Sequence, residues 1–550
     1  MEGIQLPIKI NTICIVGGGF AGWYTAAALS HNFPNIKLTV VDSDKHPRLG
    51  VGETLGWSSP YDWKRLLGLK DDRMLMWNTG AIYKYGVTAN NFYRDNSSYT
   101  NGKFFNLKVK SLSKFYGEFD YPDFEEPWSH NEGDVGLIQA WMELNKDNKK
   151  DFNDYVLELN ETSHFSKNPV APYDVNNHYV LRPKEGWSYH IDAEQTVEFF
   201  KKKAMTENTN CCHINNTIVS VKLSYDETIE KILLEDGREV SSDLFIDASG
   251  FARVLVKNLR NNKWKDMGSE FCNTACVCPT GYADPHVEMT GGTEFFGEEH
   301  GWRFKINLYH RIGNGYIFND NMVNPQRIID YMTKLTESRR LADPRLIKWT
   351  PGYYTESWMG NVIPIGVSGH LIDPFDGPSF DIHSRALEDI IVAFNKDDLS
   401  EAKTYFNESQ SIVKKERNMR LITIFGISKR QGKWWDSRRD IFDRSVYKKN
   451  LLDTLSNNQK EMETRLRHFW HQMYYRMFVL SDMDRTQLPS INLSDSDSAM
   501  SESFFSYNRA RNRYISEQQW PNYYEWLKEN RFNGLSSHEM LEILNPTLTK

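Results

Sequence analysis

Residues 13–23, which read ICIVGGGFAGW, change within a few positions from an apolar run to a series of glycines. Such a short apolar run is typical of a buried parallel strand, and the glycines that follow it favour a tight turn into a helix. The helical pattern continues through residues 24–29, and residues 36–41 (IKLTVV) form a second apolar run. The pattern therefore predicts a strand–helix–strand unit near the start of the chain.

Three glycines in this unit, Gly17, Gly19 and Gly22, fit the spacing G-x-G-x-x-G. The first allows a tight turn, the second lets the backbone approach a pyrophosphate, and the third lets the helix pack closely on its strand. Asp42 ends the second strand 20 positions after Gly22, where a ribose-binding carboxylate is expected. The glycine spacing alone is a weak signal. With strand, helix, strand and acid in register, it predicts dinucleotide binding.

Residues 78–92 (NTGAIYKYGVTANNF) alternate apolar and polar positions around one cation, Lys84, as a strand does. Because lysine is mostly a surface residue, the local sequence by itself predicts a solvent-facing side chain here. Between the first unit and this strand, Pro47, Gly50 and Gly52 favour an irregular loop that runs along the cofactor.

The middle of the chain alternates between irregular and strand-like segments. Residues 93–179 are aromatic, acidic and rich in asparagine, with no sustained period, which indicates a large insertion. Residues 243–250 (DLFIDASG) are either a second strand–glycine element that approaches the cofactor or an ordinary strand end. Residues 301–308 and 316–318 favour strands of a sheet away from the phosphates, and a glycine-bearing strand at 361–370 precedes a helix expected from Asp381.

From residue 399 onward the pattern is mostly helical, and tryptophans such as Trp434 and Trp435 favour a helical core over a ligand site. The predicted fold class is α/β, with a Rossmann-like dinucleotide-binding domain over 1–398 and a mostly helical lobe over 399–550. The first domain is expected to carry the insertion at 92–180 on its substrate side.

Composition narrows the function classes. The 550 residues carry a net charge of −7, with 40% hydrophobic residues, so neither nucleic acid nor an anionic membrane surface is an expected partner. We find neither an apolar run of membrane-spanning length nor a signal-peptide pattern, so a cytoplasmic protein is the default prediction. Cys276 and Cys278 lie in an apolar stretch without a second pair at zinc spacing, which favours a buried strand over a metal site.

Together these stretches resemble the flavin-dependent halogenases of the tryptophan halogenase type, in the same order through most of the first 440 residues. The segments that carry the resemblance are GGGFAGW, VVDSDKHPRLGVGET, GAIYKYGV, YHIDA, DLFIDASGF, GWRFKINL with RIGNGY, WMGNVIPIG and LIDPFDGPSF. The G-V-G-E-T loop, followed by a lysine between aromatic residues, distinguishes this family from other flavoproteins. The resemblance implies the FAD-binding fold of the aromatic hydroxylases and halogenases.

In that family a separate flavin reductase supplies reduced FAD, which with oxygen converts halide to hypohalous acid. The acid passes through a tunnel to a lysine that presents it to an electron-rich aromatic substrate such as a phenol or an indole. By resemblance, Lys84 is that lysine. The flavin contacts carried over in the same way are Gly17, Gly18, Gly19, Ala21, Gly22, Asp42, Ser43, Leu49, Val51, Thr54, Ile218 and Phe380.

The family also places a glutamate near the lysine, in a Leu-Glu-Ser-Thr-Gly segment whose backbone binds halide. The aligned residues here are Phe375 to Ser379, so Asp376 supplies a shorter carboxylate, and Pro378 has no N–H beside the second halide-site residue, Ser379. These departures predict a preference for bromide or iodide over chloride. The W-x-W-x-I-P signature is also altered, since only Trp302 and Ile306 of it remain.

Two alternatives stay open at the level of sequence. One is an FAD-dependent aromatic monooxygenase of the same fold, which would have no use for a remote lysine. The other is a flavin-binding protein without turnover, against which the joint presence of Lys84 and Asp376 argues. A homo-oligomer is also possible. Substrate specificity is expected to lie in the insertion and the C-terminal lobe.

Overall fold

The computed structural model describes most of the first 446 residues of the chain. The described residues are 10–46, 52–56, 59–69, 73–92, 95, 98–102, 188–260, 263–375, 377–426 and 428–446. Most of the predicted insertion at 92–180, and the predicted helical lobe beyond residue 446, lie outside the described residues.

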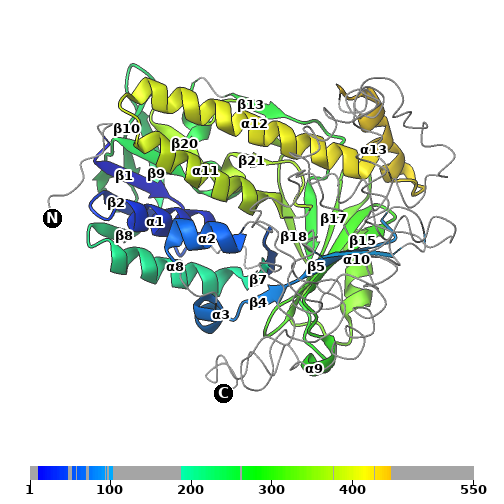
Figure 1. Ribbon diagram of the computed structural model, residues 1–550. Coiled ribbons are helices and arrows are strands. Elements are labelled where there is room, and N and C mark those ends of the chain that lie inside the picture. Colours follow the sequence, from blue (N-terminus) through cyan, green and yellow to red (C-terminus); the bar gives the residue numbers. More distant parts are fainter. Residues whose placement is uncertain are drawn as a thin grey trace, which may run out of the picture.

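A five-stranded parallel sheet forms the first layer (Figure 1). Its strand order is β20 (Val362–Pro364), β12 (Leu244–Asp247), β1 (Thr12–Val16), β2 (Lys37–Asp42) and β8 (Cys211–Asn215). The helix α1 (Phe20–Asn32) connects β1 to β2, as the hydrophobic pattern predicted. Because the chain continues to opposite sides of β1, the carboxyl ends of β1, β2 and β12 form the crevice where this fold binds ligands. The predicted Rossmann-like α/β fold is confirmed.

The helix α1 is buried on nearly all sides, from Gly22 to Ser30, which explains why its sequence is apolar throughout. It packs between the parallel sheet, α8 (Ala193–Glu207) and α11 (Pro378–Phe394). The helix α11 begins at Pro378, three residues before the expected start at Asp381, because Gly377 provides a left-handed N-cap and proline suits the first helical position.

A seven-stranded sheet forms the second layer, at the right of Figure 1. All its neighbouring strands are antiparallel except β15 and β5. Its order is β18 (Arg345–Lys348), β14 (Thr274–Val277), β17 (Ile312–Phe318), β16 (Gly301–Asn307), β15 (Gly292–Glu298), β5 (Gly86–Asn90) and β6 (Ser98–Gly102). The strands predicted from residues 301 and 316 are thus present. Cys276 lies in β14 and is buried, as expected of a strand cysteine.

Three small antiparallel sheets join these layers. The one nearest the cavity described below contains β3 (Gly52–Thr54), β7 (Ser188–Asp192) and β4 (Ile82–Lys84). The others are β9 (Ile218–Leu223) with β10 (Ile229–Leu234) and β11 (Glu239–Val240), and β13 (Trp264–Asp266) with β19 (Gly352–Tyr354) and β21 (His370–Leu371). Strand β7 lies between β3 and β4, so it sets how Lys84 sits relative to the loop that ends at Thr54.

The remaining described helices fall into two groups, seven short ones and two that belong to the predicted C-terminal lobe. The short ones are α2 (Ser59–Leu67), α3 (Arg73–Thr79), η1 (Gly250–Ala252), η2 (Val256–Asn258), α9 (Pro285–Glu288), α10 (Pro325–Thr336) and η3 (Gly366–Ser368). The lobe helices are α12 (Leu399–Gly426), which runs beside α11, and α13 (Lys433–Arg444) (Figure 1). None of the helices in the described residues is long and apolar enough to cross a membrane.

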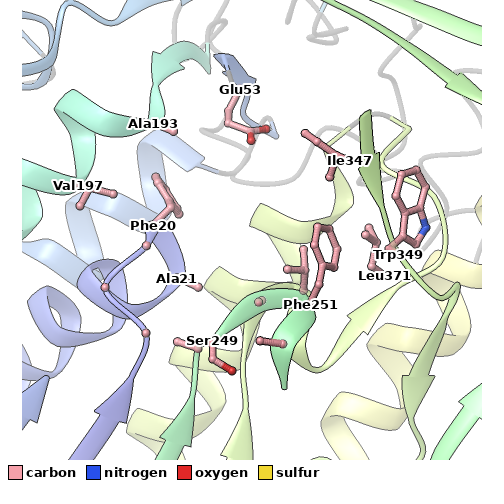
Figure 2. A pocket seen from close by; sticks show the side chains of 18 of the residues that line it. Phe20, Ala21, Glu53, Ala193, Val197, Ser249, Phe251, Ile347, Trp349 and Leu371 are labelled. Atoms are coloured by element: carbon pink, nitrogen blue, oxygen red, sulfur yellow. The ribbon is translucent and has the colours of Figure 1, made fainter. Parts of the chain in front are cut away.

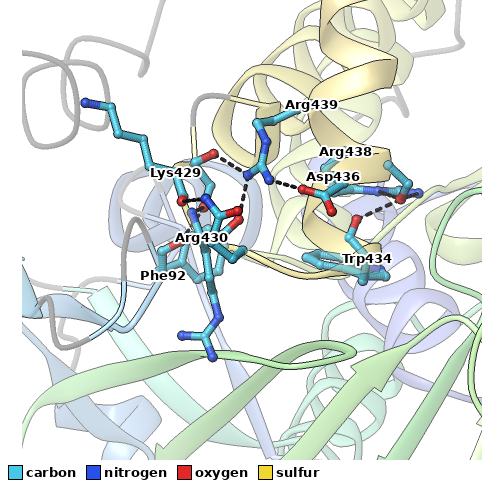
Figure 3. Close-up of polar contacts among 10 residues, drawn as sticks. Phe92, Lys429, Arg430, Trp434, Asp436, Arg438 and Arg439 are labelled. Carbon is cyan, nitrogen blue, oxygen red and sulfur yellow. Dashed lines mark hydrogen bonds and ion pairs between the residues drawn. The ribbon is translucent and has the colours of Figure 1, made fainter.

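The start of α13 is tied to the end of β5 (Figure 3). Arg439 donates from Nη1 to the carbonyl oxygens of Ser428 and Arg430, at 2.8 and 2.6 Å, and pairs with Asp436. Ser428 in turn donates to the carbonyl of Phe92 at 2.8 Å. Trp434 and Trp435 are buried in the adjoining core, as the sequence predicted. The C-terminal helices are therefore anchored to the segment between β5 and β6.

Candidate functional site

A cavity of about 860 Å³ lies between the carboxyl ends of the parallel strands and the seven-stranded sheet. One end is lined by the glycine turn at 17–21 together with Asp42 and Ser43, and the other end is apolar. The apolar lining includes Ala275, Val277, Phe295, Trp302, Phe304, Ile306, Ile317, Ile347, Trp349 and Leu371. A long cavity with one backbone-rich end and one apolar end suits a ligand with a phosphate half and a ring half.

The glycine turn shows why each glycine is needed. Gly17 has φ +112°, and a Cβ there would collide with the carbonyl of Ala248, the residue after β12. A Cβ at Gly22 would collide with the carbonyl of Gly17, so the close contact of α1 with its strand requires glycine. A Cβ at Gly19 would meet nothing within 4 Å, because Gly19 borders the open cavity. This free space at the N-terminus of α1 is where a pyrophosphate would approach the backbone.

The predicted ribose end lies beside this turn. Asp42 ends β2, its carboxylate packs against Gly18, and it also hydrogen-bonds Nε2 of His213 on β8. Ser43 bonds through its hydroxyl to Thr217 at 2.9 Å, next to the cavity-lining Ile218. His213 was missed by the sequence reasoning, and the only signal for it is the pairing of β2 with β8. The predicted contacts Leu49 and Val51 lie outside the described residues.

The second strand–glycine element also reaches the cavity, since Ala248, Ser249 and Gly250 all line it. The buried Asp247 holds this turn in place. Its Oδ1 accepts from the amide of Ser249 at 3.1 Å, and its Oδ2 accepts from the amides of Leu255 and Val256 at 2.8 and 2.9 Å. The sequence left open whether residues 243–250 approach the cofactor or form an ordinary strand end. In the structure, this segment approaches the cavity.

Lys84 is buried, with 1% of its surface exposed, so the solvent-facing side chain expected from local sequence is wrong. Its Nζ donates to the carbonyl of Leu55 at 2.8 Å, and the neighbouring Ser188 donates to the carbonyl of Gly56 at 2.6 Å. Thr54 lines the cavity, whereas Lys84 does not. The segment 54–56 therefore separates the cavity from the lysine, and we call it the partition. The strand that carries Lys84 pairs with β7, which comes about 100 residues later in the chain.

Residues 375–379, the predicted halide-binding segment, are called the halide loop. This loop meets the partition at Thr54. Pro374, Gly377 and Phe380 line the cavity. Gly377 has φ +61°, and a Cβ there would lie 2.5 Å from the carbonyl oxygen of Thr54. Pro378 and Ser379 form the first turn of α11, so this helix N-terminus is adjacent to the partition. Asp376, the second predicted catalytic residue, lies outside the described residues.

A family model described as tryptophan halogenase matches residues 12–487. The chain belongs to the tryptophan halogenase family. Among curated proteins, the tryptophan 6-halogenase ThaL of Streptomyces albogriseolus is 22% identical over 552 residues, which cover 95% of this chain and 98% of that protein. The sequence match therefore extends over nearly the whole of both chains.

Two solved structures show the same fold. BrvH, a flavin-dependent halogenase from a Brevundimonas species, has a TM-score of 0.69 at 20% identity, covering 98% of this chain and 100% of that one. A tryptophan halogenase from Shewanella frigidimarina has a TM-score of 0.74 at 18% identity, covering 98% and 99%. The predicted enzyme class, an FADH2-dependent halogenase served by a separate flavin reductase, is confirmed at the level of the family.

The cavity of this halogenase fits FAD on its own geometry. The open space at Gly19, the carboxylate beside Gly18 and the apolar far end correspond to the pyrophosphate, ribose and ring portions of the cofactor. Predicted contacts that line the cavity are Gly17, Gly18, Gly19, Ala21, Asp42, Ser43, Thr54, Ile218 and Phe380. Of the predicted contacts that the structure describes, Gly22 is the exception, because it serves the packing of α1 on Gly17.

Two carboxyl groups were missed by the sequence reasoning, Glu53 in the lining of the cavity and Asp373 beside the cavity-lining Trp302. Glu53 points into the cavity between Phe20 and Ile347 (Figure 2). Burial raises the pKa of Glu53 to about 8, although Arg311 nearby opposes the shift. Asp373, just before the halide loop, is buried, accepts from the indole N–H of Trp302 at 3.2 Å and caps the amide of Phe375 at 3.0 Å.

Asp373 explains how the remaining tryptophan of the altered W-x-W-x-I-P signature acts in the structure. Its carboxylate links Trp302 on the seven-stranded sheet to the backbone of the halide loop. Burial raises the pKa of Asp373 to about 6, and its hydrogen bonds with Phe375 and Trp302 oppose that rise. The sheet and the loop are thereby held together at the apolar end of the cavity.

Proposed function

We propose that this halogenase converts halide to hypohalous acid in the cavity and that Lys84 presents the acid to an electron-rich aromatic substrate, a phenol or an indole. The observation that carries the proposal is the position of Lys84. Its buried Nζ bonds to the carbonyl of Leu55, the residue directly after the cavity-lining Thr54. A lysine that bonds to the residue next to the cavity wall would be within reach of a small neutral oxidant made inside the cavity, and this supports the proposal.

The glycine turn would hold the cofactor through the backbone amides at the N-terminus of α1, with Asp42 and Ser43 beside the ribose. Reduced FAD, when bound, would supply two of the four electrons that reduce oxygen, and halide would supply the other two as it becomes hypohalous acid, with water as the second product. The apolar strands around Trp302 and Phe304 would exclude water from the ring end. Thr54, at the start of the partition, and Phe380 border the same space and would contact the cofactor.

Halide would bind at the N-terminus of α11, where the helix dipole favours an anion. The amide of Phe380 already donates to the carbonyl of Gly377 at 3.2 Å, and Pro378 has no N–H. The amide of Ser379 is therefore the backbone donor proposed for the halide. One donor fewer penalises chloride most, because chloride gives up the most hydration on entry. We therefore propose a preference for bromide or iodide.

Lys84 would act after hypohalous acid has formed. An ammonium can donate a hydrogen bond to the oxygen of the acid, which makes the halogen more electrophilic. The aromatic carbon then bonds to the halogen as the halogen–oxygen bond breaks, and the ring proton and the released hydroxide leave as water. Asp376 is the proposed acceptor of the ring proton, on the basis of its alignment with the family's glutamate.

A direct assay tests this function. Protein, FAD, a flavin reductase, NADH and oxygen are incubated with chloride, bromide or iodide and a panel of phenols and indoles. We expect halogenated products in the mass spectrum, more of them with bromide or iodide than with chloride. Hydroxylated products without halogen would instead support the aromatic monooxygenase considered above, and the Lys84 proposal would then fail.

A further inference from the structure

His383, on the second turn of α11, lines the cavity and is not among the residues that the sequence predicted to bind the cofactor. Its side chain is almost fully buried, with 2% of its surface exposed. One ring nitrogen, Nε2, hydrogen-bonds to Oγ1 of Thr25 on α1 at 3.1 Å. Burial lowers the pKa of His383 to about 3, so near neutral pH the ring is uncharged and carries a single proton.

The position of that proton follows from the hydroxyl group of Thr25. This hydroxyl donates to the carbonyl oxygen of Ala21 at 2.7 Å, one turn earlier in α1. A hydroxyl has one proton to give, so its oxygen acts as the acceptor towards His383. The proton of the imidazole ring is therefore on Nε2. The other ring nitrogen, Nδ1, has no proton and can only accept a hydrogen bond.

Nδ1 of His383 opens towards the cavity. Within the described part of the chain this nitrogen has no hydrogen-bond partner. It is also not sealed in the interior, as Nδ1 of His190 and Nδ1 of His370 are. Because His383 is almost fully buried and lines the cavity, the space that this nitrogen faces is the cavity. An acceptor in the wall of a cavity suits a ligand that carries an O–H or N–H donor.

The contacts of His383 place it between the two ends of the cavity. Its ring packs against Phe20, with the ring centroids 6.5 Å apart, and Phe20 packs against Phe380 at 4.7 Å. Phe20, labelled in Figure 2, directly follows Gly19, whereas Phe380 directly follows the halide loop. FAD with its pyrophosphate at Gly19 and its ring at the apolar end would carry its ribityl chain, which has hydroxyl donors, through this part of the cavity.

We propose that Nδ1 of His383 accepts a hydrogen bond from a hydroxyl group of the ribityl chain of FAD. Thr25 is the positioning residue, because its hydroxyl keeps the ring proton on Nε2. The ring also makes a T-shaped contact with Tyr24, with the centroids 4.9 Å apart, and the hydroxyl of Tyr24 is bonded to Ser384 at 3.0 Å. The orientation of the imidazole is thereby fixed on two sides. The inference rests on the part of the proposed function that places FAD in this cavity.

Ligand binding without turnover tests the inference, with four ligands that divide the cofactor into parts. FAD and riboflavin carry the ribityl chain, lumiflavin has a methyl group in its place, and ADP represents the nucleotide end alone. His383→Phe keeps a flat ring and removes both nitrogens. We expect its dissociation constants for FAD and riboflavin to rise about threefold to tenfold, as for one neutral hydrogen bond. Those for lumiflavin and ADP should not change. Fluorescence titration measures the flavins, and calorimetry measures ADP.

Three further variants separate the hydrogen bond from packing. His383→Asn carries a carbonyl oxygen near the position of Nδ1 and should recover most of the lost affinity for FAD. Thr25→Val removes the hydroxyl that keeps the ring proton on Nε2, so the proton can move to Nδ1 and a smaller loss is expected than in His383→Phe. His370→Phe is the matched control, because His370 is a buried histidine that bonds to Asn418 at 3.0 Å and does not line the cavity. It should leave all four dissociation constants unchanged.

The inference and the proposed function can fail separately. If the wild-type protein binds FAD and His383→Phe binds FAD and riboflavin equally well, the role of His383 is wrong and the proposed function stands. An equal loss for lumiflavin would also overturn the inference, because the donor would then be on the flavin ring, and an equal loss for ADP would show a packing defect instead. If the wild-type protein does not bind FAD, the proposed function itself is wrong.

Discussion

Nζ of Lys84 and the carbonyl oxygen of Leu55 are 2.8 Å apart, which joins two positions separated by 29 residues across the wall of the cavity. The hydrogen bond holds the lysine against the partition, one residue from the cavity-lining Thr54. A flexible four-carbon side chain is thereby fixed at one point. The same bond ties the segment 54–56 to β4.

Replacing Lys84 should separate halogen transfer from the flavin reactions. In Lys84→Ala, we expect halogenated product to fall at least about a hundredfold, in line with the loss of a positioned acid–base group. Binding of FAD and oxidation of reduced FAD by oxygen should persist, because Lys84 does not line the cavity. Product analysis and oxygen consumption check this, with Lys84→Met as the variant that preserves side-chain volume. Regiospecific product at the wild-type level would contradict it.

Two glycine substitutions should behave in opposite ways. Gly19→Val should fold, because a Cβ at Gly19 meets nothing within 4 Å, but the side chain would fill the space for the pyrophosphate. We expect its FAD dissociation constant to rise at least about a hundredfold, which corresponds to roughly 3 kcal/mol. Flavin fluorescence titration measures it.

Gly17→Val should instead lose the fold, since φ is +112° and a Cβ would strike the Ala248 carbonyl. Circular dichroism and thermal unfolding distinguish the two variants. A Gly19→Val protein that retains FAD would mean that the nucleotide lies elsewhere.

Glu53 should make stability depend on pH. Its pKa is about 8 in the folded protein and near 4.5 when unfolded, so between these values the folded chain holds a proton that the unfolded chain has released. The free energy of unfolding therefore falls as pH rises through this window. Glu53→Gln cannot ionise and should gain in melting temperature relative to wild type from pH 5 to pH 9. The exposed Glu230→Gln serves as the control, and an equal trend in both variants would refute the assignment.

Halide preference should be visible in direct competition. With equal chloride, bromide and iodide and an electron-rich phenol, we expect brominated or iodinated product to exceed chlorinated product about tenfold or more, the value of one missing hydrogen bond to a charged group. Mass spectrometry quantifies the products. A predominance of chlorinated phenol would show that the proline at residue 378 leaves the halide site unimpaired.

Local sequence was enough to predict the half of the protein built around β1, α1 and β2. The strand–helix–strand unit, the glycine turn and the position of Asp42 are requirements of adjacent residues, so hydrophobic period and glycine spacing were enough to predict them. The same local pattern missed His213, which meets Asp42 only because β8 pairs with β2.

The arrangement of residues around the partition depends on contacts between distant parts of the chain. Lys84 has the local sequence of a surface lysine, but it is buried in the assembled fold, where its strand pairs with β7 and its Nζ bonds to Leu55. Thr54, Thr293 and His190 lie on three separate strands, and their hydrogen bonds exist only once those strands are assembled. Burial shifts the pKa of Glu53 and of His190. The burial of a side chain depends on all the residues packed around it, so it cannot be predicted from the neighbouring sequence alone.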